Sequence, residues 1–287
     1  MPRIAPRTFQ RHQKYLSAPL DHAVAEGILP KNPFKQFVLG EKAISAMRRG
    51  LPETTRKLWH DEFQQLLATE AWTSDKTAIT DPIYWVPLIA RLSGMRSEEI
   101  LQLKPANIRS LDGVYYFEIE RGTGQSVKSE NGKRLVPIHS QLLELGFLEL
   151  VAHQRRLAKR RIFDTIQRAR TKKNTYAEIM NGRFEYYRKR HDVYERRLDL
   201  HGLRTTFNSE CVALAVPDTA RRYLMGHQNP DVGIVNYLPE GFPITTLKYY
   251  IEMQRIDISS ITRRFRAEDQ YPPGPRLAAV GGRRLTG

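Results

Sequence analysis

The sequence predicts a mainly helical protein that carries one small antiparallel β-sheet. Apolar residues recur at helical spacing in several segments, most regularly at residues 83–92. A short stretch, residues 113–120, is rich in the aromatic and β-branched residues that favour strands. The pair Asn131-Gly132, a strong signal for a tight hairpin turn, separates this stretch from a second strand candidate at residues 134–138. Together these observations indicate a helical domain interrupted by a small sheet.

Composition limits the classes of protein to which the chain can belong. Its 287 residues, 40% of them hydrophobic, suffice for one sizeable core and a second small one. Lysine and arginine outnumber aspartate and glutamate by 46 to 31, and the net charge of +15 favours a polyanionic partner, nucleic acid first. The sequence has no run of eighteen apolar residues and no apolar secretory stretch near its start. We therefore expect a cytoplasmic protein without a membrane partner.

Cysteine usage and motif content also bear on cofactors. The single cysteine, Cys211, excludes an internal disulfide and a zinc site built from cysteines, and we interpret it as a small buried apolar residue. The sequence contains neither a phosphate-binding glycine loop nor a cluster of residues with metal-ligand spacing. We therefore expect no cofactor and no metal ion.

The N-terminal segments divide the chain into parts. Residues 8–29 have the apolar spacing of one or two helices and are followed by the Asn32-Pro33 break. We expect a small helical domain and a linker over residues 1–50, and a main domain over residues 51–265. The tail at residues 266–287 is rich in proline and glycine, a composition typical of disorder.

Helix signals then follow one another through the main domain. Thr54-Thr55 can cap a helix that carries Leu58 and Leu67, and the helix at residues 83–92 should end at Gly94, a residue suited to a left-handed cap. We expect Ser97 to cap the next helix, whose first turn is acidic. A last helix is predicted at residues 247–258, with a possible role against a neighbouring subunit.

Residues 139–190 are helical in pattern and densely basic. Such runs are most often solvated helix faces, and the alternative is contact with phosphate groups. The motifs described next favour phosphate contact for the segment as a whole, without assigning it to single residues.

Several residues have the chemistry that cleavage of a phosphodiester by transesterification requires: a nucleophile, cationic donors to the phosphate oxygens, and a proton source for the leaving oxygen. Arg96 lies between a helix end and a helix start, and its planar fork suits two phosphate oxygens. The alternative for Arg96 is a surface ion pair with Glu99, three residues on.

A second group of candidates follows later in the chain. His201 and Arg204 are spaced i and i+3, so in a helix they share a face. His201 taken alone is more often a partly buried structural histidine. His227 follows Gly226, the expected end of a helix at residues 217–225, and is therefore free to point into a site.

The nucleophile and the proton source complete the set. Tyr237 lies ten residues after His227, and a phenol becomes a nucleophile only beside cations that favour its phenolate form. Tyr249 and Tyr250 are competitors for this role. Lys128, just before the hairpin turn, could donate a proton to a departing oxygen.

This ordered set resembles the signature of the tyrosine recombinase or phage integrase family over about residues 54–261. The resemblance implies that Arg96 and Arg204 hold the scissile phosphate and that Tyr237 attacks it to leave a 3′-phosphotyrosine and a free 5′ hydroxyl. It further implies that His227 donates a hydrogen bond to the phosphate and that Lys128 is the general acid. His201 would assist proton transfer or support the phosphate, and Glu99 would orient Arg96.

At the level of the whole protein, the resemblance implies a site-specific DNA recombinase that needs neither ATP nor a metal ion. Its partner would be double-stranded DNA at attachment-type sites, on which homo-oligomers, dimer to tetramer, assemble. Residues 8–34 resemble the end of the family's helical core-binding domain. Thr205 departs from the pattern, because many relatives carry a histidine there.

Three alternatives remain at this point. A type IB topoisomerase would use related chemistry without exchanging DNA partners. A catalytically incompetent or truncated DNA-binding module would keep the basic surface alone. A metal-dependent nuclease could be built on His201 and His227, and activity that resists EDTA would exclude it.

Overall fold

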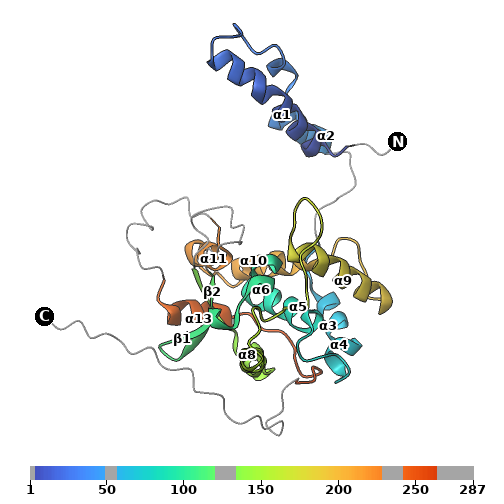
Figure 1. Ribbon diagram of the computed structural model, residues 1–287, viewed down its shortest axis with the longest axis vertical. Coiled ribbons are helices and arrows are strands. Elements are labelled where there is room, and N and C mark those ends of the chain that lie inside the picture. The colour runs from blue at the N-terminus through green and yellow to red at the C-terminus, as the bar shows by residue number, and fades with distance from the viewer. Residues whose placement is uncertain (1–3, 49–56, 120–133, 228–241, 264–287) are drawn as a thin grey trace, which may run out of the picture. The chain divides into compact units, whose positions relative to one another are not determined.

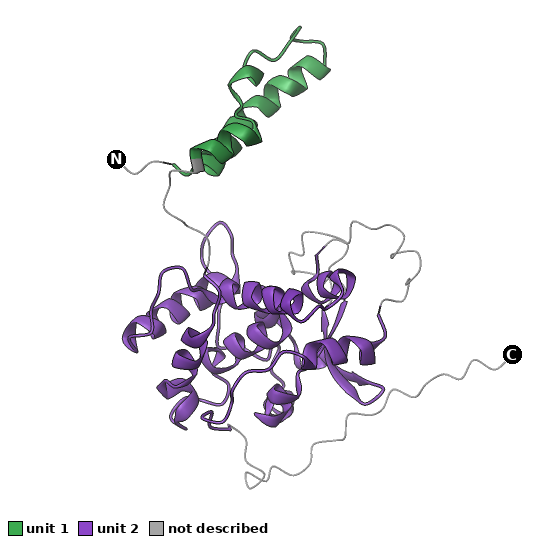
Figure 2. Cartoon of the chain, turned by 180° about the vertical axis from the view of Figure 1, so that it is seen from behind, with its two compact units in different colours: residues 1–55 green, residues 56–287 purple. Residues whose placement is uncertain are grey.

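A computed structural model describes residues 4–48, 57–119, 134–227 and 242–263 (Figure 1). The chain forms two compact units, residues 1–55 and 56–287 (Figure 2). Within the described residues no helix is both long enough and apolar enough to cross a membrane. The predicted disordered tail, residues 266–287, lies outside the described residues.

Unit 1 is held together mainly by polar contacts. It consists of α1 (Pro6–Ala25), the short 3-10 helix η1 (Lys35–Phe37) and α2 (Glu41–Arg48). The buried amides of Gln10 and Gln13 donate to the carbonyl oxygens of Leu39 and Phe37 at 2.7 and 2.6 Å. Helix α2 was not predicted from the sequence, and among the described residues of this unit Ile44 is the one fully buried apolar side chain.

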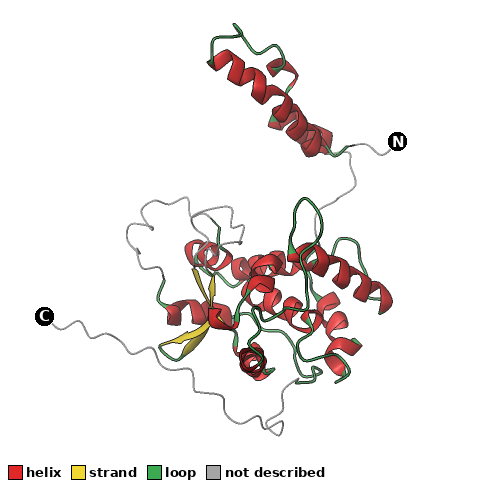
Figure 3. Cartoon of the chain, viewed as in Figure 1, coloured by secondary structure: helices red, strands yellow, loops and turns green. Residues whose placement is uncertain are grey.

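Unit 2 is mostly helical, as Figure 3 shows. Its helices are α3 (Asp61–Leu67), α4 (Glu70–Thr73), α5 (Pro82–Ser93), α6 (Ser97–Gln102), η2 (Pro105–Asn107), α7 (Ser140–Glu144), α8 (Phe147–Arg156), α9 (Tyr176–Arg190), α10 (Leu200–Ala213), α11 (Asp218–Met225) and α13 (Ile244–Glu252). The predicted helix at residues 83–92 is confirmed as α5.

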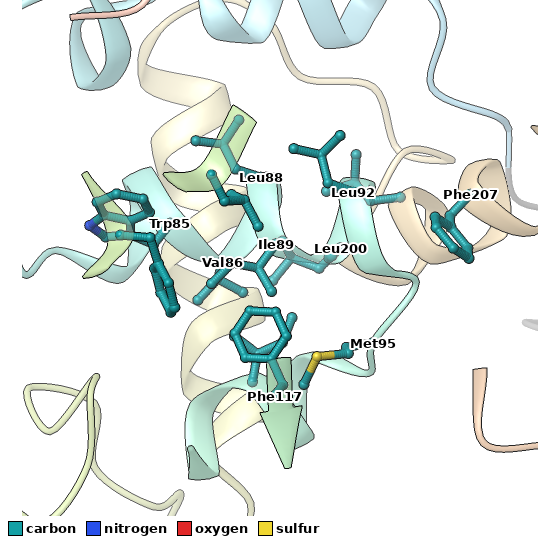
Figure 4. Packing of buried hydrophobic residues seen from close by; sticks show 14 of the residues in the cluster. Trp85, Val86, Leu88, Ile89, Leu92, Met95, Phe117, Leu200 and Phe207 are labelled. Carbon is teal, nitrogen blue, oxygen red and sulfur yellow. The ribbon is translucent and has the colours of Figure 1, made fainter. Parts of the chain in front are cut away.

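Helix α5 forms the centre of the core. All twelve of its residues are buried, and it packs along α10. Its own Trp85, Leu88, Ile89 and Leu92 lie in one buried cluster with Phe117 of the sheet and Phe207 of α10, as labelled in Figure 4. Truncation of a fully buried aromatic such as Trp85 to alanine would cost about 3–5 kcal/mol, because it leaves a cavity. Residues 94–96 therefore start from a rigid support.

The small antiparallel sheet is confirmed, with one more strand than predicted. Strands β1 (Ile108–Leu111), β2 (Val114–Ile119) and β3 (Arg134–Pro137) lie in the order β1-β2-β3. Asp112 and Gly113 join β1 to β2, and both have positive φ, as a type I′ turn requires. This Asp-Gly signal was present in the sequence and would have revealed β1. The Asn131-Gly132 turn lies outside the described residues.

Four predicted helix boundaries differ from those in the structure. Helix α3 begins at Asp61, and Leu58 is not helical; the preceding segment is fixed by Trp59, whose backbone N–H donates to Thr206 Oγ1 at 2.8 Å. Thr54-Thr55 lies outside the described residues. The N-cap of α6 is Arg96, with Ser97 as its first helical residue. Residues 157–175 are not helical, and the predicted C-terminal helix is shorter, ending at Glu252.

Helix α13 packs within its own unit rather than standing apart from it. Leu247 and Ile251 are completely buried, and the helix lies against β3 and β2. Its Glu252 accepts hydrogen bonds from the backbone N–H and the hydroxyl of Ser140 at 2.7 and 2.6 Å. The described part of the C-terminal region is thus fastened to the sheet edge.

Candidate active site

Two helices end at glycines where only glycine fits. Helix α5 ends at Gly94 (φ 65°) and α11 ends at Gly226 (φ 60°), as the sequence predicted for both. A Cβ atom at Gly94 would lie 2.4 Å from the ring of Phe207, and one at Gly226 would lie 2.5 Å from Arg134 Nη1. Both ends therefore combine a left-handed backbone with a very close neighbour. Their last carbonyl groups, which have no partner within the helix, are left for side chains.

Arg204 takes up these carbonyl groups from both helices. It lies on α10 and is only 3% exposed. Its guanidinium donates to the carbonyl oxygen of Gly94, and to that of Met225 at 2.6 Å. Among the described residues it forms no ion pair, and its charge is stabilised by the negative ends of two helix dipoles and by the nearby carboxylate of Glu99. Burial, and then the charges of Arg96 and Arg134, lower the pKa of Arg204 to about 9, which leaves it cationic at neutral pH.

His227 follows directly on the end of α11 and contacts Arg204. Its Nε2 lies 2.8 Å from Arg204 Nη2. Since a guanidinium can only donate, Nε2 accepts and the ring is neutral. Desolvation of the ring, followed by the charges of Arg204 and Arg96, lowers the pKa of His227 to about 4, and Arg221 and Arg222 of α11 act in the same direction. The imidazole therefore stands uncharged in a strongly cationic environment.

Glu99 forms the other half of the site by binding two arginines. Its carboxylate accepts from the backbone N–H of Arg96 at 3.0 Å and from Arg96 Nη1 at 2.8 Å. It also accepts from Arg134 Nη2 at 2.8 Å. Burial alone would raise the pKa of Glu99, but Arg134 and then Arg96 lower it to about 2. The carboxylate is therefore ionised at neutral pH.

Arg96 contacts both Glu99 and the end of α11. It pairs with Glu99, and its Nη2 also donates to the carbonyl oxygen of Gly226 at 3.2 Å, beside His227. Its side chain remains 41% exposed. The guanidinium N–H groups of Arg96 that make neither contact can therefore bind an anion from solvent.

Arg134 is the residue of this site that the sequence interpretation missed. Its side chain is 1% exposed, it pairs with Glu99, and its Nε donates to the carbonyl oxygen of Leu224 at 2.9 Å. It therefore links β3 to α6 and to the end of α11. A signal existed, because Arg134 shares one face of its strand with Val136 and Ile138, which are both fully buried. A charged residue on such a face needs a buried partner.

The remaining predicted site residues differ in how far the structure describes them. His201 lies in the first turn of α10, one turn before Arg204, as the spacing required. It is exposed, whereas Arg204 turns into the protein, so the helix is confirmed but the two side chains do not lie together, and His201 is not the partly buried histidine of the alternative. Lys128 and Tyr237 lie outside the described residues. The contacts thus bring together Arg96, Glu99, Arg204 and His227, together with Arg134.

The site's chemistry suits an anionic oxygen ligand. Guanidinium groups bind phosphate oxygens through charged, directional hydrogen bonds. Within the described residues there is no group of three histidine, cysteine or acidic side chains that could hold a metal ion. Cys211 is buried, and burial raises the pKa of its thiol to about 12, so it acts as the apolar residue expected from the sequence.

Comparison with solved structures identifies the class of the fold as that of the tyrosine recombinases. The integrase of the Tn1549 transposon, solved in complex with transposon right end DNA, is similar with a TM-score of 0.50 and 16% identity, over 90% of this chain and 78% of that one. An integrase from mycobacterium phage Brujita gives 0.43 and 17%, over 91% and 79%. Lambda integrase (residues 75–356), a dimer bound to a core site, gives 0.47 and 18%, over 78% and 73%.

The sequence places the chain within that class. The profile of the phage integrase family matches residues 56–239. The chain belongs to the phage integrase family and is a tyrosine site-specific recombinase. No curated protein sequence matches it.

Proposed function

We propose that this chain cuts and rejoins double-stranded DNA at attachment-type sites through a 3′-phosphotyrosine link at Tyr237. The observation that carries the proposal is that Arg96, Arg204 and His227 meet where α5 and α11 end. Tyr237 follows His227 by ten residues in the sequence. The net charge of +15 and the DNA in the Tn1549 complex support DNA as the substrate.

Binding of the scissile phosphate would use the two arginines differently. Arg96 offers its solvent-facing N–H groups, while Arg204 offers Nη2, which now donates to His227. A phosphate oxygen would replace His227 Nε2 as the acceptor for Arg204. The imidazole, freed from that contact, would then donate a hydrogen bond to the phosphate.

The reaction exchanges one phosphate ester for another. Tyr237 Oη attacks phosphorus, the bond between phosphorus and the 5′ oxygen breaks, and Lys128 gives that oxygen its proton. His201 takes up the phenol proton or supports the phosphate. In the second step a 5′ hydroxyl attacks the phosphotyrosine and releases the tyrosine. One ester bond forms for each that breaks, so no ATP is needed.

Glu99 and Arg134 would be positioning residues. Glu99 fixes the backbone and the guanidinium of Arg96, and Arg134 fixes Glu99 and the end of α11 that leads to His227. Fixed cations aimed at developing charge stabilise a transition state without reorganisation. Because these guanidiniums would neutralise the phosphate, we propose a reaction that needs no divalent metal.

Unit 1 would contribute to DNA binding as part of a core-binding domain, with residues 1–50 as that part and its linker. Its exposed apolar side chains on α1, among them Phe9, Tyr15 and Leu16, support a segment that functions next to further protein or DNA. As in the lambda integrase dimer on its core site, we propose that protomers assemble on DNA, up to a tetramer.

The test is the formation of a covalent protein–DNA adduct. Nicked suicide substrates made from sheared host DNA are incubated with protein in EDTA and then denatured in SDS. We expect an adduct with the wild type and with Tyr249→Phe, and none with Tyr237→Phe. An adduct that persists in Tyr237→Phe would move the nucleophile elsewhere. No adduct on DNA that the protein demonstrably binds would favour the non-catalytic DNA-binding module.

A further inference from the structure

The basic residues between α8 and the end of α9 separate into two groups. In the first, the side chains are used inside the protein. Arg155 donates to the carbonyl oxygens of Pro105 and Ile108 at 2.7 and 2.9 Å, and Arg161 donates to that of Ile166 at 2.7 Å. These cations serve the fold, because they satisfy carbonyl groups of irregular backbone.

The second group has no such role. Arg170, Lys172 and Lys173 lie within five consecutive exposed residues, 170–174. Across the described parts of the chain, none of the three forms an ion pair or a side-chain hydrogen bond. Glu178 accepts a hydrogen bond from the hydroxyl of Thr171 at 2.7 Å, but it forms an ion pair with none of the three cations, which stand within four residues of each other. This arrangement, hereafter the basic turn (residues 170–173), disfavours the free protein by mutual repulsion unless an anion is bound.

Hydrogen bonds between the residues that flank the basic turn hold it in a defined shape. The backbone N–H of Ala169 donates to the carbonyl oxygen of Thr175 at 3.0 Å, which closes the loop at its base. Arg168 Nη1 donates to the carbonyl oxygen of Asn174 at 3.0 Å, and its guanidinium lies 4.7 Å from the ring centroid of Tyr176. The loop therefore presents its cations from a fixed base.

The base of the loop is attached to the helix that carries the active-site anchor. The backbone N–H of Ala177, at the start of α9, donates to Glu98 Oε2 at 2.7 Å. Glu98 precedes Glu99, which holds Arg96. In Figure 1 the loop stands out from the body next to α9. The base of the basic turn and the carboxylate that holds Arg96 are thus attached to neighbouring residues of α6.

We propose that the basic turn binds the sugar-phosphate backbone of duplex DNA on the flank of the scissile phosphate. The proposal rests on the proposed function for its substrate and adds a second contact surface in the same unit. Duplex DNA carries one negative charge per about 1.7 Å of axis, so closely spaced cations find several phosphates. Phosphate contacts position the duplex and carry no sequence information, so the turn would set affinity rather than target choice.

The test measures DNA binding without cleavage. The triple variant Arg170→Gln, Lys172→Gln, Lys173→Gln is made in a Tyr237→Phe background, and its affinity for a mixed-sequence duplex of about 40 base pairs is followed by fluorescence anisotropy at several salt concentrations. We expect binding at least about tenfold weaker, with the slope of log affinity against log salt reduced by about 2–3 for three lost phosphate contacts.

A matched control removes the same charge elsewhere. It carries Lys76→Gln, Lys104→Gln and Arg255→Gln, which are exposed basic residues outside the turn. Its slope should stay at the parent value. An equal change in both triple variants would overturn the proposal, as would an unchanged slope in the first. If the first triple variant loses binding to phosphatidylglycerol vesicles to the same extent, the basic turn binds anionic surfaces in general and the proposal of a DNA contact is wrong.

The two experiments distinguish failure of the proposed chemistry at Tyr237 from failure of the proposal for the basic turn. If the parent protein binds duplex with the expected salt slope but no adduct forms at Tyr237, the chemistry is wrong and the basic turn stands. If adducts form and the triple variant binds like the control, the turn is wrong and the chemistry stands.

Discussion

The two halves of the candidate active site bind their arginines by different means. In the Glu99 half, two guanidiniums share one ionised carboxylate. In the Arg204 half, the described contacts of the buried guanidinium are helix-end carbonyl groups and a neutral imidazole. In the first half two guanidiniums share one carboxylate, so a net charge of about +1 remains in a fixed frame. The second half adds a guanidinium that forms no ion pair among the described residues, and a phosphate would neutralise the charge that both halves leave.

This contrast explains why cations can gather here without unfolding the protein. A buried cation without a counter-charge is costly, and helix ends reduce that cost only in part. Binding of an anion offsets the remaining cost of burying the cation. The charge that preorganises the site therefore also favours anion binding. The predictions below test whether the halves differ in this way.

The largest effect should come from Arg204. We expect Arg204→Ala to lower the rate of adduct formation by about 10³-fold, because one fixed donor to developing charge contributes about that much. Arg204→Lys should recover little, since an ammonium cannot span two carbonyl groups and a phosphate. Single-turnover cleavage of a suicide substrate measures this. A lysine variant with nearly wild-type rate would show that the fork geometry at the helix ends is unimportant.

Arg134 should matter first for stability. Arg134→Met leaves Glu99 buried with a single partner, and the free energy of unfolding should fall by about 3–5 kcal/mol. Denaturant unfolding of the variant measures this, with Arg109→Met, which removes the exposed partner of Glu118, as the control that should change it by less than about 1 kcal/mol. Adding Glu99→Gln to Arg134→Met should restore part of the loss, because the unpaired charge is gone. No restoration would contradict the shared-carboxylate frame.

The pairing of Glu99 should also appear in the pH dependence of stability. A carboxyl whose pKa falls from 4.5 unfolded to about 2 folded stabilises the protein fully above pH 4.5, and this contribution is lost as the pH falls toward 2. It amounts to about 3 kcal/mol. The free energy of unfolding of the wild type should therefore decline more steeply than that of Glu99→Gln between pH 4.5 and 2. Parallel curves would mean that Glu99 is not paired as described.

The smallest effect is the titration of His227. In the free protein its imidazole should titrate near pH 4, because desolvation and the charges of Arg204 and Arg96 disfavour the imidazolium. Duplex DNA bound to the Tyr237→Phe variant should raise this pKa, since a phosphate favours the protonated ring. NMR of ¹⁵N-labelled imidazoles, assigned with His227→Gln, reports it. A pKa near 6.5 without DNA would indicate that the contact with Arg204 does not form in solution.

The sequence by itself determined the local parts of this site. Gly94 and Gly226 were predictable as helix ends because their backbone requirement is local. His201 and Arg204 were predictable as neighbours on one helix, and the ordered motifs predicted the family. The Asp112-Gly113 turn was equally readable and was missed.

Only the tertiary structure decided how these parts meet. Arg96 donates to Gly226, 130 positions away, and Arg204 donates to Gly94, 110 positions away. Arg134 reaches Leu224 across 90 positions, so a residue assigned to a strand became part of the site. Helical and strand periodicities describe neighbours within a few residues of each other. Contacts between distant segments depend on how the whole core packs around α5, and no local pattern encodes that packing.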